Sequence, residues 1–348
     1  SFIKCNILIK FAPMEKGGEL SALQSLIERS KHISVITHEH PDGDAAGSSG
    51  ALVHYLKYIG KTDISLIREP LADTIAFIDR QESLFGEQAI NAIEKSDLIF
   101  CCDFCVLERC GQPYKALKDS HAVKVLLDHH VRAENDEFEL AFSRTDISSA
   151  CEMVYEILRE LCPDEKSRKD LFSGQCGYCL MCGMTTDTNN FSCATFPSTF
   201  NMASQLLSYG IDRDDIIANL YNNYRENRVR AFANFLSSNR FTIREDGLAI
   251  IKVSALDWHT FGLKEGELEG LVNVPLSIGK VKVTIYFRED EMTIRVSIRA
   301  KRGWSARKIA QKYFNGGGHE LASGGKLFIG KDIHSFSEID KYVEKIEL

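Results

Sequence analysis

Four short apolar segments in the first half of the chain constrain the fold most strongly, because each has the length and composition of a buried strand. These segments are 33–37, 64–67, 98–102 and 123–127. Helical patterns separate them, for example over 20–29 and 46–59, and another follows at 148–161. Strands that alternate with helices predict βαβ units, and therefore an α/β fold with a mostly parallel, doubly wound sheet.

The second half of the chain is organised differently. Residues 200–238 show helical patterns with few strand signals, and we interpret them as a helical linker. After residue 240 the strand-like segments return, at 241–243, 248–253, 281–287 and 292–298, with one helical pattern at 305–313. The sequence therefore predicts an N-terminal domain over 15–199, the linker over 200–238, and a smaller C-terminal α/β domain over 239–348.

Acidic and histidine side chains follow three of the first-half strands. Another follows the segment 176–184, and we expect that position to be a strand-to-loop junction as well. These residues are His38, Asp42, Asp44, Asp103, Asp128, His129, His130 and Asp187. In an open α/β sheet, ligands bind beyond the carboxyl ends of the strands. Carboxylate oxygens mixed with imidazoles suit Mn²⁺, and also Mg²⁺ or Co²⁺. The sequence therefore predicts a cation site at this edge of the sheet.

The number of ligands favours two cations over one. Six candidates, namely His38, Asp42, Asp44, Asp103, His129 and Asp187, are too many for one small cation that keeps open positions. Two cations about 3.5–4 Å apart, with one bridging carboxylate, fit better. Four converging carboxylates without cations would also repel each other strongly. Each residue alone is more often a cap or turn residue, so the prediction depends on the ordered set.

On these motifs the chain resembles the DHH phosphoesterase superfamily, in the group that carries the DHH-associated C-terminal domain. Within that group it is most similar to the bifunctional nanoRNases, which degrade short oligoribonucleotides and act as pAp phosphatases. The motifs that carry the resemblance are 38–48, Asp103 with Arg109, Asp128-His129-His130, Thr186-Asp187-Thr188, and Gly316-Gly317-Gly318-His319 with Ala322, Gly324 and Gly325. One departure is Asn189, which stands where the family often has glycine.

The resemblance implies a role for each residue of these motifs. His38 and Asp42 would hold one cation, while Asp44, His129 and Asp187 would hold the other. Asp103 would bridge the two cations, His130 would face the scissile phosphate, and Asp128 would orient the neighbouring histidines. Arg109 would lie near the site, either in a structural ion pair or as a phosphate contact.

A two-cation site of this kind suits phosphoester hydrolysis. The cations would activate a water for in-line attack and stabilise the charge that develops on the phosphate oxygens. His130 would add a hydrogen-bond donor and could protonate the leaving ribose oxygen.

The segment Gly316-Gly317-Gly318 has two readings, a tight turn between helix and strand or a backbone cradle for a phosphate. Its surroundings favour the cradle, because between Glu291 and Lys326 eight basic residues face two acidic ones, a local charge of +6. The resemblance implies that Arg299, Gly317, Gly318 and His319 bind the end of the substrate away from the cut. Such a grip would favour very short RNA over long polymers.

Several alternatives stay open at this point. The chain could be a cyclic or linear dinucleotide phosphodiesterase, an exopolyphosphatase-like phosphohydrolase, or a nucleotide-binding module without catalysis. The sequence does not rank pAp, dinucleotides, cyclic dinucleotides and polyphosphate as substrates, and a homodimer is left open. None of the six expected cation ligands is missing, which favours an enzyme over a binding module.

Composition excludes other classes of protein. Apolar residues make up 44% and charged residues 26% of 348 residues, as in globular proteins, and no apolar run is long enough for a membrane helix. The formal charge of −7 argues against a broad surface that binds duplex DNA.

Eleven cysteines and no signal peptide favour a reduced, cytoplasmic protein, with Met14 as a candidate internal start. We expect Cys176, Cys179 and Cys182 to pack in the core, although their spacing also occurs in iron–sulfur sites.

Overall fold

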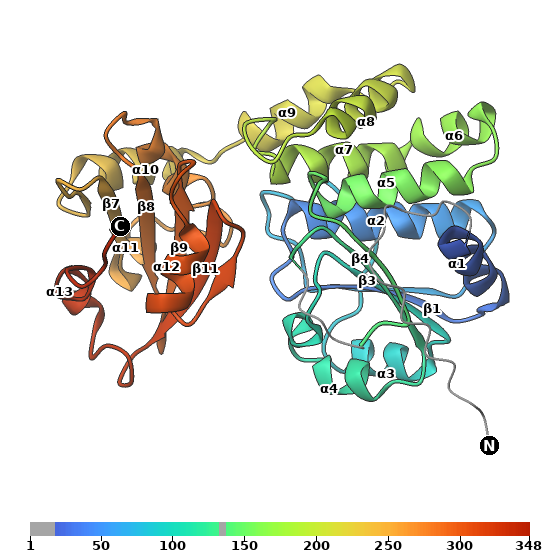
Figure 1. Ribbon diagram of the computed structural model, residues 1–348, viewed down its shortest axis with the longest axis horizontal. Coiled ribbons are helices and arrows are strands. Elements are labelled where there is room, and N and C mark those ends of the chain that lie inside the picture. Colours follow the sequence, from blue (N-terminus) through green and yellow to red (C-terminus); the bar gives the residue numbers. More distant parts are fainter. Residues whose placement is uncertain (1–17, 132–136) are drawn as a thin grey trace. The chain divides into compact units, whose positions relative to one another are not determined.

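The structure, a computed structural model, describes residues 18–131 and 137–348, in two compact units (Figure 1). The N-terminal unit contains the described residues up to Leu71 together with Ile75–Ile216, and the C-terminal unit contains Ala72–Thr74 with Ile217–Leu348. The division after Ile216 falls inside the segment that we expected to be a linker, so the domain limits 15–199, 200–238 and 239–348 stay a proposal. The candidate start at Met14 lies outside the described residues.

A five-stranded parallel sheet forms the centre of the N-terminal unit, which confirms the predicted fold class. Its strands are β1 (Ile33–Thr37), β2 (Ile64–Ile67), β3 (Leu98–Cys102), β4 (Val123–Asp128) and β5 (Leu140–Ser143). Every neighbouring pair is parallel, in the order β2-β1-β3-β4-β5. Strands β1 and β3 are buried along their whole length, which explains why their sequences are apolar without alternation.

Helices cover both faces of this sheet (Figure 1). On one side lie α2 (Gly43–Tyr58), α5 (Ala150–Leu161) and α7 (Gln175–Asp187), and on the other lie α3 (Glu87–Lys95) and α4 (Tyr114–Asp119). The remaining helices of the unit are α1 (Gly18–Arg29), α6 (Glu165–Phe172), α8 (Pro197–Ser208) and α9 (Arg213–Tyr221), the last of which continues past Ile216. Helices α2 and α7 approach closely because Gly47 and Gly183 face the contact. An added Cβ would lie 2.5 Å from the carbonyl oxygen of Cys179 at Gly47, and 2.9 Å from the carbonyl oxygen of Gly43 at Gly183.

The strand order determines where the functional site can form. The order in which strands are added reverses between β1 and β3, because the connection from β1 leads to β2 on one side and the later strands continue on the other, all of them parallel. In doubly wound sheets, loops diverge at such a switch point and leave a crevice at the carboxyl ends of the strands. The residues that follow β1 and β3 therefore lie at the edge where a ligand can bind.

The C-terminal unit contains a six-stranded mixed sheet in the order β10-β11-β9-β8-β7-β6. The strands are β6 (Phe241–Ile243), β7 (Leu248–Val253), β8 (Val283–Glu289), β9 (Thr293–Ala300), β10 (Gly317–Gly318) and β11 (Ala322–Phe328). Helices α12 (Ala306–Tyr313) and α13 (Ile339–Val343) pack on one face through an apolar core. Helix α10 (Glu226–Ser237) and the segment 263–272 cover the other face, and the short helix α11 (Ala255–Thr260) follows β7.

The cysteines are mostly internal. Cys176, Cys179 and Cys182 are buried in α7, as we expected, and all three are free thiols. Among the described residues, no helix combines the length and the apolar character needed to cross a bilayer.

Candidate metal centre

The loop after β1 and the first turn of α2 supply three of the expected cation ligands. His38 directly follows β1, and Asp42 is the N-cap of α2, where its Oδ1 accepts hydrogen bonds from the backbone nitrogens of Asp44 and Ala45, both at 3.0 Å. Ser, Asp and Asn favour this position because their side chains satisfy the first amides of a helix. The cap turns Asp44 into the buried first turn of α2, where it is 1% exposed.

His38, Asp42 and Asp103 form one group whose ligand atoms all lie within 4.8 Å of one another. The Nε2 atom of His38 lies 3.5 Å from Oδ2 of Asp103 and 4.0 Å from Oδ1 of Asp42. The other ring nitrogen of His38, Nδ1, lies 2.8 Å from the carbonyl oxygen of Glu39. That contact orients the ring and directs Nε2 toward the two carboxylates.

Asp44, His129 and Asp187 form a second group with the same spacing. His129 follows β4, and its Nε2 atom lies 3.7 Å from Oδ2 of Asp44 and 3.6 Å from Oδ2 of Asp187. Asp187 is the last residue of α7, so the expectation that it ends a strand was wrong. Helix α7 instead points its C-terminal turn at the edge of the sheet and brings Asp187 to the same place.

Asp103 lies between the two groups. Its Oδ2 faces His38, and its Oδ1 lies 3.6 Å from Nε2 of His129. The residue has a positive φ of 66°, a strained conformation for a non-glycine residue that often marks a functional site. Its Oδ1 is buried and accepts no hydrogen bond from the described residues. A buried carboxylate oxygen without a donor, set between two imidazoles and three other carboxylates, fits a divalent cation.

In the absence of cations, protonated histidines compensate the negative charge of the carboxylates. Burial lowers the pKa of His38, but the hydrogen bond with Asp103 and the charges of Asp42 and Asp103 outweigh it and raise the pKa to about 9. Burial likewise opposes the charge of His129, but Asp103, Asp187 and Asp44 raise its pKa to about 10. The protonated imidazoles then occupy the place of positive charge that cations would otherwise fill.

The carboxyls respond in opposite directions. Burial raises the pKa of Asp44 well above its usual value, and repulsion from Asp103 and Asp187 adds to it. Burial would also raise the pKa of Asp103, but its contacts with His129 and His38 outweigh burial and hold the pKa well below the usual value. Asp103 is thus the carboxylate that stays charged, as a bridging ligand must.

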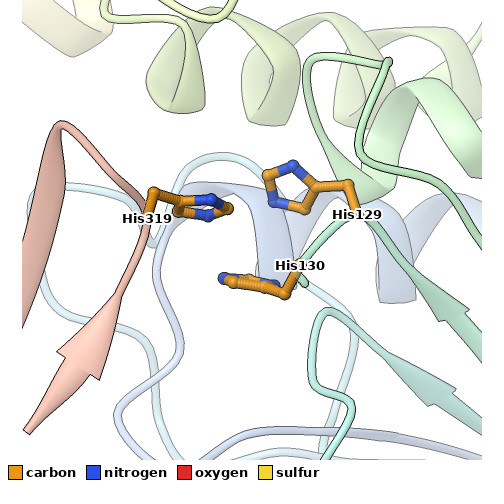
Figure 2. A group of neighbouring side chains, drawn as sticks. All are labelled: His129, His130 and His319. Atoms are coloured by element: carbon orange, nitrogen blue, oxygen red, sulfur yellow. The ribbon is translucent and has the colours of Figure 1, made fainter. Parts of the chain in front are cut away.

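Asp128, the last residue of β4, and His130 complete the motif at the end of that strand. Oδ1 of Asp128 lies 2.7 Å from Nδ1 of His130, and the Asp128 carboxyl is fully buried. Figure 2 shows the adjacent rings of His129 and His130, whose centroids are 4.6 Å apart; its third side chain, His319, belongs to the C-terminal unit. Because Asp128 engages Nδ1, the other ring nitrogen, Nε2, is the atom through which His130 can reach a ligand.

Arg109 is exposed on the 3₁₀ helix η1 (Leu107–Cys110), and its carbonyl oxygen accepts a 2.7 Å hydrogen bond from the backbone nitrogen of Glu39. Its charge lowers the pKa of His38, against the stronger effects above.

In the C-terminal unit, the strand β11 joins the four expected substrate-binding residues. Arg299 on β9 is paired with Ala322 on β11, and Gly318 on β10 is paired with Ser323 on β11. The backbone nitrogen of His319 donates to the carbonyl oxygen of Ala322 at 2.8 Å. Gly317 and Gly318 are therefore a strand, and the expectation of a tight turn or a nest does not describe them. A Cβ at Gly318 would lie 2.9 Å from backbone atoms of β11, so glycine is required for this pairing.

One functional feature escaped the sequence analysis. Both carboxylate oxygens of Asp44 accept hydrogen bonds from the N-terminus of α5, from Ala150 and Cys151. The signal was present as Ser149-x-x-Glu152, the spacing of a capping box that starts a helix.

The chain is similar to several known proteins. Residues 32–184 match the DHH family, N-terminal domain, and residues 247–345 match the DHHA1 domain. The chain is 28% identical over 328 residues to the bifunctional oligoribonuclease and PAP phosphatase NrnA of Bacillus subtilis, covering 91% of this chain and 95% of that one. It is 24% identical to the cyclic-di-AMP phosphodiesterase GdpP of Geobacillus thermodenitrificans, covering 89% of this chain and 48% of that longer protein. Among solved structures, an exopolyphosphatase-related protein from Bacteroides fragilis is 30% identical with a TM-score of 0.83, covering 94% and 96% of the two chains.

Proposed function

The chain belongs to the DHH family of phosphoesterases and carries a DHHA1 domain, and from this premise we propose that it hydrolyses short oligoribonucleotides and removes the 3′-phosphate of pAp. The observation that carries the proposal is the pair of ligand groups, His38/Asp42/Asp103 and Asp44/His129/Asp187. Asp103 belongs to the first group and also contacts His129 of the second. The relative from Bacillus subtilis, which has both activities in its name, supports the choice of substrates.

We propose that the two groups hold two divalent cations, of which Mn²⁺ suits the mixed carboxylate and imidazole donors best. When bound, such cations acidify a water and stabilise charge on a phosphoryl oxygen. Asp103 presents one oxygen to each group, which is the arrangement a bridging ligand needs. Mg²⁺ and Co²⁺ are the alternatives that the same donors accept.

His130 acts on the phosphate in this proposal. Asp128 holds the ring through Nδ1, so that the ring plane is fixed and Nε2 is directed away from Asp128. When the ring is protonated, Nε2–H donates to a phosphate oxygen and can pass its proton to the leaving ribose oxygen. Asp128 stays a hydrogen-bond acceptor throughout and keeps the ring in this orientation.

Arg109 and the C-terminal unit bind the substrate. The side chain of Arg109 is exposed and its charge acts on His38, and of its two expected roles we propose the phosphate contact. In the C-terminal unit, Arg299 supplies charge, and the glycines of β10 and β11 leave a stretch of strand without side chains beside it. We propose that Arg299, Gly317, Gly318 and His319 bind the end of the substrate away from the cut, which favours dinucleotides over long RNA.

Two other functions have support from relatives. The cyclic-di-AMP phosphodiesterase of Geobacillus thermodenitrificans is similar over most of this chain, and the similar Bacteroides fragilis structure is described as exopolyphosphatase-related. A cyclic dinucleotide would bring a phosphodiester, and polyphosphate a phosphoanhydride, to the same ligand groups. These substrates are therefore outcomes that the experiment has to separate.

The test is a side-by-side assay with Mn²⁺ on pAp, a diribonucleotide, a 20-residue RNA, cyclic di-AMP and polyphosphate. We expect the highest kcat/KM on the diribonucleotide, activity on pAp, and a marked loss on the long RNA. The Asp103→Ala variant serves as the control for contaminating enzymes. Equal activity on long RNA and dinucleotide would contradict the short-substrate proposal, and a preference for polyphosphate would replace it.

A further inference from the structure

The carboxylate of Asp44 accepts hydrogen bonds from the N-terminus of α5, a helix that is distant in the sequence. The backbone nitrogen of Ala150 donates to Oδ2 of Asp44 at 2.6 Å, and the backbone nitrogen of Cys151 donates to Oδ1 at 2.8 Å. These two residues begin α5, and the first amides of a helix have no partner within the helix. The carboxylate thus satisfies two orphan amides at the positive end of the helix, and the helix fixes both oxygens of Asp44.

The start of α5 is itself fixed by a buried carboxylate, that of Glu152. Ser149 is the N-cap, and its Oγ accepts a 3.1 Å hydrogen bond from the backbone nitrogen of Glu152. The Glu152 side chain, which is 0% exposed, turns back so that Oε2 accepts from the backbone nitrogen of Ser148 at 2.9 Å and from the Ser148 hydroxyl. Glu152 therefore stabilises, through its hydrogen bonds with Ser148, the turn that positions the amides that bind Asp44.

The same oxygen of Glu152 also binds a second segment. The hydroxyl of Thr199 donates to Oε2 at 2.8 Å. Thr199 lies in the first turn of α8, where its Oγ1 accepts from the backbone nitrogen of Phe196 at 3.1 Å. The segment 188–196 joins this turn to Asp187 at the end of α7. Glu152 therefore connects the support of Asp44 with the end of the loop that leaves Asp187.

We propose that Glu152 is a positioning residue for the cation that Asp44, His129 and Asp187 hold, and that it acts through Ser148 and Thr199 without touching the cation. The inference rests on the proposed two-cation centre and extends it to residues outside the ligand set. Its specific content is an asymmetry between the two sites. Within the described part of the chain, the hydrogen bonds of the Glu152 side chain go to Ser148 and Thr199, and none goes to the loop of His38 or to β3.

The expected size of the effect follows from related cases. Loss of a group that orients a metal ligand weakens metal binding by about 10–100-fold. Glu152→Gln keeps the volume of the side chain, but it replaces a strong charged acceptor by a weaker one and buries an amide donor. Thr199→Val removes the hydroxyl that donates to Glu152 and accepts from Phe196, and Thr199→Ser retains both hydrogen bonds.

The experiment is calorimetric titration of Mn²⁺ into the full chain, with thermal unfolding of the cation-free proteins measured in parallel. We expect Glu152→Gln to weaken one of two Mn²⁺ sites about tenfold or more and to leave the other within about twofold of wild type. Thr199→Val should weaken the same site by less, and Thr199→Ser should bind like wild type. In a His38→Ala background, where the first site is impaired, the remaining site should be the one that Glu152→Gln weakens.

Two results would overturn the inference. One is unchanged Mn²⁺ affinity at both sites in Glu152→Gln and Thr199→Val, whatever happens to their melting temperatures, because Glu152 would then only stabilise the fold. The other is an equal loss at both sites, which would remove the asymmetry. A wild-type protein that takes up no divalent cation would instead refute the proposed function, so the two failures are distinguishable.

Discussion

Cation binding at this centre should release protons, because the two imidazoles that would bind cations carry a proton in the cation-free protein at neutral pH. The pKa of His38 is raised to about 9 and that of His129 to about 10. A metal needs the lone pair of a neutral imidazole, so the cation and the proton compete for the same nitrogen. Both Nε2 atoms face the carboxylates, which makes them the atoms for which the two compete.

The magnitude follows from these values. One pKa unit is a tenfold change in the protonation ratio, so at pH 7 about one His38 ring in 100 and about one His129 ring in 1,000 is neutral. Between pH 7 and about 8.5 each pH unit should therefore strengthen the binding of each cation about tenfold. Each cation should displace about one proton from its imidazole.

Calorimetric titration of Mn²⁺ at pH 7 in two buffers with different ionisation enthalpies would measure the number of protons released. We expect at least about two for the two cations, and about one fewer in a His38→Gln variant, which keeps a polar side chain without a titrating ring. Affinities that stay constant within about twofold from pH 7 to 8.5, with no proton released, would refute this account of the centre.

Four further predictions test other parts of the structure. Asp103→Ala should reduce turnover on a dinucleotide on the order of 10³-fold or more while the far-UV circular dichroism spectrum stays unchanged. Arg299→Ala should raise KM for the dinucleotide about 10–100-fold with a smaller change in kcat, because a hydrogen bond to a charged group is lost. Gly183→Ala should lower the free energy of unfolding in urea by about 1–3 kcal/mol, since a Cβ there would lie 2.3 Å from a cysteine sulfur. The folded-state pKa values of His38 and His129 exceed 6.5, so their stabilisation is complete below pH 6.5, and the melting temperature of the cation-free protein should fall as pH rises toward 9 and 10.

The predictions that the structure confirms rest on strong local signals. The strands β1, β3 and β4 are short, mostly apolar runs bounded by polar loops, and that composition is typical of a buried parallel strand. The side chains after them were expected to converge, and the parallel order of the sheet places these strand ends at one edge. Chain order and strand polarity thus carry enough information for that part of the site.

The parts that sequence reasoning missed depend on tertiary contacts. Helix α7 is rich in Cys, Met and Gly and is buried almost all round, so it has no amphipathic period that would separate it from a strand. Strand β5 has only four residues and is recognisable mainly by its pairing with β4. Gly317 and Gly318 have no side chains that favour a strand, and the ladder with β11 makes them one. The hydrogen bonds from Ala150 and Cys151 to Asp44 join residues more than 100 positions apart, a separation that local patterns do not detect.

Part of the acidic excess behind the net charge of −7 lies in the metal centre. Four of these acidic side chains, Asp42, Asp44, Asp103 and Asp187, belong to the two ligand groups. The amides of α5 and two protonated imidazoles already stabilise these carboxylates, so the fold can present the ligands before any cation arrives. Two divalent cations would then cancel the four negative charges, and an anionic substrate would meet no local repulsion there. Together with the +6 segment around Arg299, this removes the electrostatic objection to a short, highly charged oligonucleotide while leaving the objection to a broad duplex-binding face in place.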